Sequence, residues 1–356
     1  MPDDQTTPWR TAGIWVIAIT VAACALYFGR EFFVPIVFAV MLSILLRPVV
    51  RTLERFHIPT PLGAAVVVLT LIGLFVLAGW LLVAPIQNWM ATAPQRFEQA
   101  QEKLNRLRQP VQKVQDVAKK LGQVTDGAST QPAGEATPAP APAQQSSLTN
   151  RLAGATTSIL GEIIEVLVLT YLLLASGRLF VQKLVKVTPG FRDKQVALNV
   201  IRETQDVVAR YIAVTAIINV VQGTIIGLVL WWIGMPSPLV WTAATIVLEF
   251  IPYLGATVMV ALLSITAFAT FDHTGRILAA PGAYLLITTL QNNVVSPYAY
   301  GNRLKLNPVA VLVGVLLWWF LWGTGGAFLA VPIVATVKVL ADRVERLKPL
   351  GEFLGE

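Results

Sequence analysis

Long apolar runs constrain the fold of this 356-residue chain more than any other feature. A helical bilayer crossing needs about 20 mostly apolar residues. Six stretches approach that length, at residues 13–28, 32–50, 62–83, 155–174, 211–232 and 277–295. Because backbone N–H and C=O groups find no water in hydrocarbon, a crossing segment must satisfy them within a helix. The sequence therefore predicts an all-α polytopic membrane protein with about six full spans.

Charged residues are few, and they lie in short runs between the apolar blocks. Only 13% of the residues are charged and 55% are apolar, whereas soluble domains carry roughly 25% charged residues. The net charge of +7 is thus distributed as in a membrane protein. We therefore expect the lipid bilayer, and no nucleic acid, as a partner.

Two basic segments predict the orientation of the chain. The second apolar run ends in a basic cluster of Arg47, Arg51, Arg55 and His57, and residues 178–210 contain seven basic residues against three acidic ones. By the positive-inside rule both segments face the cytoplasm. We therefore predict a multi-pass protein of the bacterial inner membrane, with an amphipathic helix at residues 191–210 on the inner surface.

A polar region separates the third apolar run from the fourth and divides the chain into three predicted parts. These are a three-span region at 1–90, an extramembrane segment at 91–150 and a membrane transport core at 151–356. Within 91–121, apolar residues recur at spacings of three and four, which is typical of a helix with an a/d seam. Pro110 predicts a kink there, or two shorter helices.

The seam of 91–121 has two interpretations: it packs against a copy of itself, or it lies on the membrane face of its own protein. Residues 126–147 are rich in Pro, Ala, Ser and Gln. This composition buries too little apolar surface to offset the entropy of ordering. We therefore expect a disordered extracytoplasmic linker.

Two further apolar blocks are each interrupted near the middle by turn residues. The halves are 239–250 and 256–271 in the first block, and 309–322 and 327–340 in the second. Each block is either one kinked span or a re-entrant hairpin that leaves on the side it entered. Hairpins place Asp272 outside and the basic pair Arg303 and Lys305 inside, so charge favours hairpins entering from opposite sides. Paired interrupted segments point to the binding site of a transporter.

The second half of the chain resembles the autoinducer-2 exporter family of bacterial membrane proteins. The resemblance rests on LEFIPYLGA at 248–256, on SPYAYGNRLKLNPVAVLVGVLLWWFLWGTGGAFLAVPIVATVKVL at 296–340, and on the tail LKPLGEFLGE. It is strong over 196–356, whereas only the layout of the spans matches before that. The resemblance implies a membrane carrier, usually homo-oligomeric. Some members are linked to autoinducer-2 export and others to sodium/proton exchange.

Glu249 is the main candidate for an ionisable group in the transport path, as a cation ligand or a proton carrier. Charged groups within a bilayer are expensive, so those present are functional candidates. The alternative is a carboxylate that caps loop N–H groups. Pro252 and Gly255 would set the turn, while Tyr253 would offer its hydroxyl to a solute or place its ring at an interface.

Amides in two spans could complete the same cavity or could bond neighbouring helices. They are Asn219 and Gln222, three residues apart on one helical face, and the consecutive residues Gln291, Asn292 and Asn293. Members of the resembled family often have Glu-Gly-Asn at the latter position, so no carboxylate role transfers to Gln291.

Two more groups of residues have alternative interpretations. Glu162 and Glu165 form a second proton site or reach the outer interface. Gly323, Gly325 and Gly326 make the second break either a gate or a point of tight helix packing.

The sequence contains no Walker lysine loop, no HExxH and no GxSxG motif. We therefore predict no enzyme activity, no cofactor and no metal. The function that fits best is secondary, ATP-independent transport of a small hydrophilic solute, such as an autoinducer-2-like signal or a cation exchanged for protons. The alternative is a membrane scaffold or assembly protein that acts through the 91–121 helix.

Overall fold

The computed structural model describes residues 8–123, 145–177, 179, 183, 186, 191–300 and 306–355. The elements in these ranges are helices, apart from one isolated antiparallel bridge between Leu306 and Gly355. The all-α prediction is thereby confirmed. Four described helical stretches are long and apolar enough to cross a membrane, Arg30–Arg55, Thr60–Thr92, Leu198–Ile233 and Pro308–Arg343.

Helices α2 (Arg30–Arg55) and α3 (Thr60–Gln123) form a bundle with α4 (Gln145–Ala175). Helix α1 (Pro8–Phe28) ends at Gly29, and α2 begins directly after it. Helix α4 packs against α2 and against α3. The shared core is apolar, and its buried members are Val50, Ala64, Val67, Val68, Leu167 and Leu174.

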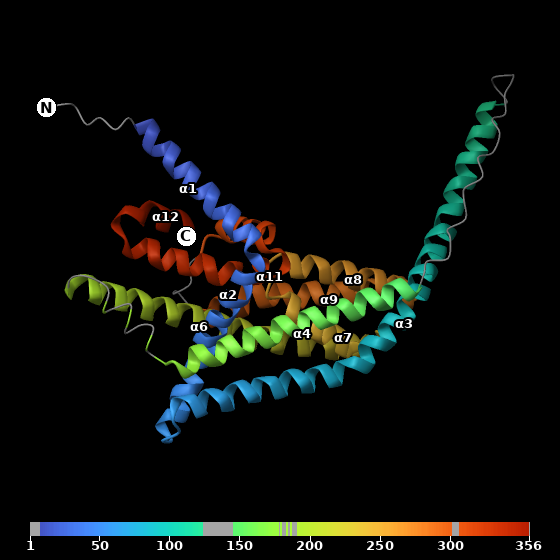
Figure 1. Ribbon diagram of the computed structural model, residues 1–356. Helices are drawn as coiled ribbons and strands as arrows, with labels where there is room; N and C mark the ends of the chain where they lie inside the picture. The colour runs from blue at the N-terminus through green and yellow to red at the C-terminus, as the bar shows by residue number, and fades with distance from the viewer. Residues whose placement is uncertain are drawn as a thin grey trace.

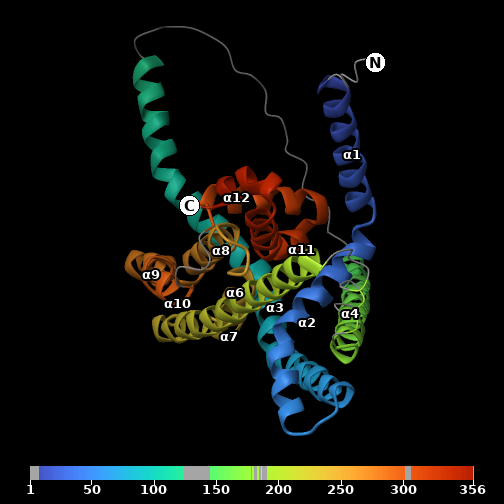
Figure 2. The ribbon, with the colours of Figure 1, turned by 90° about the vertical axis from the view of Figure 1, so that its left-hand side faces the viewer.

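Helix α3 (Thr60–Gln123) is a single element of 64 residues. The span expected at 62–83 and the extramembrane helical segment expected at 91–121 are thus parts of one continuous helix. Pro110 does not end the helix, and the side chains of the predicted seam lie outside the described part of the structure. Figures 1 and 2 show that the far end of α3 projects away from the other helices.

Two other boundaries also differ from the prediction. Helix α4 begins ten residues before the predicted start of the fourth span, while the remainder of the predicted linker, up to residue 144, lies outside the described residues. Helix α6 (Phe191–Ile233) joins the predicted surface helix at 191–210 to the fifth span without a break. In both places an amphipathic sequence and an apolar one keep the same helical period, so nothing local stops the helix.

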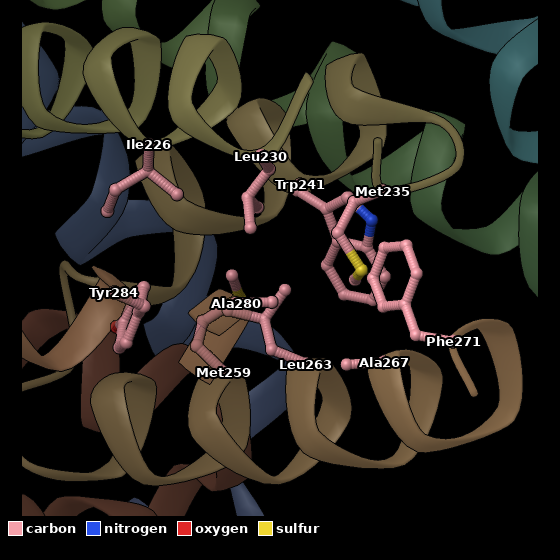
Figure 3. Packing of buried hydrophobic residues seen from close by; sticks show 10 residues of the cluster. All are labelled: Ile226, Leu230, Met235, Trp241, Met259, Leu263, Ala267, Phe271, Ala280 and Tyr284. Atoms are coloured by element: carbon pink, nitrogen blue, oxygen red, sulfur yellow. The ribbon is translucent and has the colours of Figure 1, made fainter. Parts of the chain in front are cut away.

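The first interrupted block is a helical hairpin. Helix α7 (Pro238–Leu248) and helix α8 (Leu254–Thr270) reverse at the intervening turn, and α9 (Thr274–Leu290) follows α8. Side chains of α6 and α8 point toward one another in the core between these helices (Figure 3). The core residues in that view are Ile226, Leu230, Met235, Trp241, Met259, Leu263, Ala267, Phe271, Ala280 and Tyr284.

A π-helical turn, Gln291–Val295, interrupts the helix that continues from α9 to α10 (Ser296–Tyr300). π-Helical turns accommodate an extra residue and occur frequently at functional sites.

The second interrupted block, α11 (Pro308–Arg343), also reverses direction. Gly323 has φ +64° and ψ −143° inside it, which breaks the helix into two halves. A Cβ on Gly314 would lie 2.6 Å from Val334 Cγ2, so residues on either side of the break face each other. The start of α11 also contacts the C-terminal helix α12 (Lys348–Leu354), because Asn307 N–H donates to Leu354 O at 3.0 Å.

The two hairpins meet at their tips. The rings of Phe250 and Phe328 stack with centroids 4.7 Å apart, and Ile251 shares a buried cluster with Ala327 and Ala330. The breaks predicted near Tyr253 and Thr324 are therefore confirmed. Although Phe250 and Phe328 are 78 positions apart in sequence, the fold brings them into contact.

Candidate functional site

Glu249 lies directly after the last residue of α7, at a tightly constrained turn. Pro252 C=O accepts a hydrogen bond from Leu254 N–H at 2.7 Å, and the residue between them, Tyr253, has φ +64° and ψ −45°. These features define a γ-turn of the rare, strained kind. Backbone strain of this sort costs about 1–3 kcal/mol and is concentrated at functional sites.

Gly255 allows the two helices of the hairpin to approach closely. A Cβ at this position would lie 2.0 Å from Leu248 O, the last carbonyl of α7. Only glycine fits so near a backbone atom. The close approach at the turn after Glu249 therefore requires Gly255, and Pro252 contributes the carbonyl that closes this turn.

Three side chains from two other helices surround the Glu249 carboxylate. Tyr284 O–H on α9 donates a short hydrogen bond to Glu249 Oε1, and Gln222 Nε2 on α6 donates to the same oxygen at 3.3 Å. Gln222 Nε2 also donates to Thr288 Oγ1 at 2.9 Å. Glu249 is half-buried, whereas Gln222, Tyr284 and Thr288 are buried. We call this set of four residues the Glu249 network.

Asn219 connects the same face of α6 to α7. Its Nδ2 donates to Ile246 O at 3.3 Å, and its side chain is buried. The helices come this close because Gly223 and Gly227 face α7, where a Cβ on Gly227 would lie 1.8 Å from Thr242 Oγ1. Of the predicted pair, Gln222 therefore contacts Glu249, whereas Asn219 bonds the backbone of α7 at Ile246.

Tyr284 and Thr288 were not among the predicted site residues. They lie four residues apart on α9, so both project from one face of a mostly apolar helix. In the sequence, the four-residue spacing of these two hydroxyl groups was the feature that could have indicated a polar site. Tyrosine and threonine also occur in apolar cores and at interfaces, so the spacing alone did not distinguish a site residue from an ordinary packing residue.

The amides Gln291, Asn292 and Asn293 lie in the π-helical turn, and their described hydrogen bonds are local. Gln291 Nε2 donates to Ser296 Oγ at 2.7 Å, and Asn293 Nδ2 donates to Thr289 O at 2.8 Å. Asn292 and Asn293 are exposed. Among the described contacts, none joins these amides to the Glu249 network.

The remaining candidates are spread over the surface and the second hairpin. Glu162 and Glu165 are exposed on α4, and Tyr253 is 54% exposed. Gly326 is buried where a Cβ would lie 2.0 Å from Trp318 O, and Gly325 faces Val34 of α2. Tight packing at the second break is therefore observed for Gly326.

Outside the apolar helices, one lysine connects α3 to the end of α8. Lys103 Nζ donates to Phe271 O at 3.1 Å and pairs with Asp272 Oδ1 at 2.8 Å. The hydrogen bond and the positive charge of Lys103 lower the pKa of Asp272 below its ordinary value. At this point the predicted extramembrane helix contacts its own chain.

Fold and site together define a multi-pass helical membrane protein in which a carboxylate network lies at a helix break. The described residues contain no group of three or more His, Cys, Asp or Glu side chains that could hold a metal ion. The sequence model that describes the AI-2E family of transporters matches residues 16–346 of this chain. The chain therefore belongs to the AI-2E transporter family.

Several relatives are named for transport. The chain is 24% identical over 341 residues to the AI-2 transport protein TqsA of Escherichia coli, covering 95% of this chain and 93% of the relative. It is 25% identical over 336 residues to a provisionally named transport protein of Mycobacterium tuberculosis, covering 93% and 88%. A provisionally named transport protein of Borreliella burgdorferi is 29% identical over 210 residues, which cover 58% of this chain but only 56% of the relative.

Proposed function

We propose that the chain is a secondary transporter and that the Glu249 network is its solute or ion site. The observation that carries the proposal is the convergence of α6, α7 and α9 on one carboxylate at a helix break. An acid at mid-bilayer costs about 3 kcal/mol on insertion scales. A chain that keeps one there, with hydrogen-bond partners from two other helices, is expected to use it.

The hairpins supply the second part of the proposal. We infer that they enter the bilayer from opposite sides and that about six full spans surround them in a bacterial inner membrane. The contact between Phe250 and Phe328 supports this arrangement, because two re-entrant hairpins from opposite sides would meet tip to tip. Broken segments that meet in this way expose backbone dipoles where a cavity can use them.

The chemistry of the network indicates the kind of cargo. The hydrogen-bond partners of Glu249 are a phenol and an amide, and neither carries a positive charge. A neutral hydroxylated solute or a cation therefore fits better than an anion. Export of an autoinducer-2-like signal, or cation exchange for protons, is consistent with this preference and with the name of the Escherichia coli relative.

Purified protein in sealed vesicles tests the proposal. Uptake of autoinducer-2, of radioactive sodium and of protons is measured for the parent, for Glu249→Gln and for Glu352→Gln. The glutamine in Glu249→Gln keeps the shape of the side chain but cannot ionise, so the transported species should lose most of its flux. Glu352 is exposed on α12 and serves as the matched control.

Normal flux through Glu249→Gln would contradict the carrier mechanism. The scaffold alternative makes the opposite prediction. In that case Leu107→Asp in α3 would abolish the cellular phenotype while Glu249→Gln leaves it intact.

A further inference from the structure

One face of α6 is polar along its buried length. Tyr211, Thr215, Asn219 and Gln222 follow one another at spacings of four, four and three, which places them on one side of the helix. Thr215, Asn219 and Gln222 are only 4%, 3% and 3% exposed. We call these four residues the α6 polar face. Buried polar groups in a membrane span are costly, so a continuous line of them calls for an explanation.

The far end of this face is closed by a tyrosine from another helix. Tyr300 of α10 places its hydroxyl 2.8 Å from Thr215 Oγ1, and its ring stacks on Tyr211 with centroids 5.8 Å apart. Thr215 O–H donates to Tyr211 O at 2.7 Å. Because a threonine hydroxyl has one proton, Tyr300 O–H is the donor to Thr215.

The π-helical turn places Tyr300 on this face. Tyr284 faces α6. In an uninterrupted α-helix with about 3.6 residues per turn, the residue four turns later that faces the same side would be near 298. The extra residue of the π-helical turn shifts that position about one residue onward. In agreement, Tyr298 is 87% exposed, whereas Tyr300 is half-buried against α6.

The other end of the α6 polar face has an acceptor with no partner. Gln222 Oε1 is fully buried and accepts no hydrogen bond from any described residue, while Nε2 of the same amide donates twice. Buried acceptors are nearly always paired in native structures. An unpaired one between Asn219 and Glu249 marks a position that a donor group of a passing solute or water would occupy.

We propose that the α6 polar face is the conduit leading from the Glu249 network, and that Tyr300 is the gate closing its far end. Seven residues of helix separate Thr215 from Gln222, which is about 10 Å. The inference rests on the proposed transport function and extends it to Tyr211, Thr215 and Tyr300. The structure shows the closed state, since Thr215 is buried beneath the Tyr300 hydroxyl.

Cysteine labelling in vesicles tests the gate without knowledge of the cargo. Cys24, the only cysteine, is replaced by alanine, and Thr215→Cys is then introduced. The probe is a small, positively charged methanethiosulfonate reagent. Tyr300→Ala should raise the labelling rate of Thr215→Cys about tenfold, the factor expected for removing about one hydrogen bond. Tyr298→Ala, the exposed neighbour, should leave the rate unchanged.

Leu230→Cys excludes simple loosening of the fold. Leu230 is equally buried on the same helix, at 1% exposure, but it lies in the apolar core. Faster labelling of Thr215→Cys alone supports the gate. Equal acceleration at both positions, or no acceleration at Thr215→Cys, overturns it.

Flux measurements separate this inference from the proposed function. If Glu249→Gln loses transport but Tyr300→Ala leaves Thr215→Cys unlabelled, transport stands and the gate is wrong. If Glu249→Gln transports normally while the labelling pattern is as expected, the conduit stands and the role of Glu249 is wrong.

Discussion

Substitution of Gly255 by alanine should open the turn that positions Glu249. The new Cβ would lie 2.0 Å from Leu248 O, whereas ordinary contacts begin at 3.4 Å, so the carbonyl must retreat by about 1.4 Å. The obstacle is backbone and cannot rotate aside. Overpacking of this kind costs about 1–3 kcal/mol, which exceeds the gain of at most about 1 kcal/mol in helix propensity from replacing glycine.

The measurement is the apparent melting temperature of detergent-solubilised protein, followed by tryptophan fluorescence. A loss of about 1–2 kcal/mol should lower it by about 2–4 °C. Because Leu248 precedes Glu249, transport should fall as well. Gly282→Ala in α9 is the matched control, since nothing lies within 4 Å of its added Cβ and alanine favours the helix. Its melting temperature should stay level or rise.

An unchanged melting temperature and normal transport in Gly255→Ala would refute this reasoning. It would mean that α7 and α8 are not packed as closely as the turn requires. A large loss in both glycine variants would also refute it, because the effect would then not depend on contact with Leu248.

Two smaller predictions concern contacts away from the site. The pKa of Asp272 is lowered by Lys103, so its ion pair stabilises the folded state above the ordinary aspartate pKa of about 3.9 and is lost as the pH falls through the lowered value. The melting temperature of Asp272→Asn should therefore differ from that of the parent at pH 7, and the difference should shrink as the pH falls below the ordinary aspartate pKa. A difference that stays constant down to acid pH would contradict the pairing. Trp322 Nε1 donates a hydrogen bond to Leu26 O at 2.9 Å. Trp322→Phe should therefore lower the free energy of unfolding by about 1 kcal/mol and the melting temperature by about 2 °C. An unchanged melting temperature would show that this bond between α11 and α1 contributes nothing to stability.

The sequence predicted the class of fold and the two breaks, because both depend on local chemistry. Long apolar runs must form helices in lipid. Pro252 and the glycines around residue 323 are residues that favour turns, and they mark where each apolar block is interrupted. Helix ends were predicted less well. The boundary expected between 62–83 and 91–121 is absent from α3, because a change from apolar to amphipathic composition alters the surroundings of a helix but not its backbone.

The site was predicted in part for a similar reason. Glu249, Asn219 and Gln222 stand out because charged and amide groups are rare in apolar spans. Tyr284 and Thr288 do not stand out, and only the packing of α9 on α6 brings them to the carboxylate. Their role depends on contacts between helices that are distant in sequence, which residue spacing within one helix does not specify.

The contact between the hairpins connects the two breaks mechanically. Phe250 directly follows Glu249 and stacks on Phe328, five residues after Gly323. Gly323 has a positive φ and no heavy atom within 4 Å of an added Cβ, so space remains around this turn, whereas Gly255 and Gly326 are tightly enclosed. A movement at the second tip is therefore best accommodated at Gly323. We expect any such movement to reach Glu249 through the Phe250–Phe328 stack, because closely packed side chains transmit displacement to their neighbours.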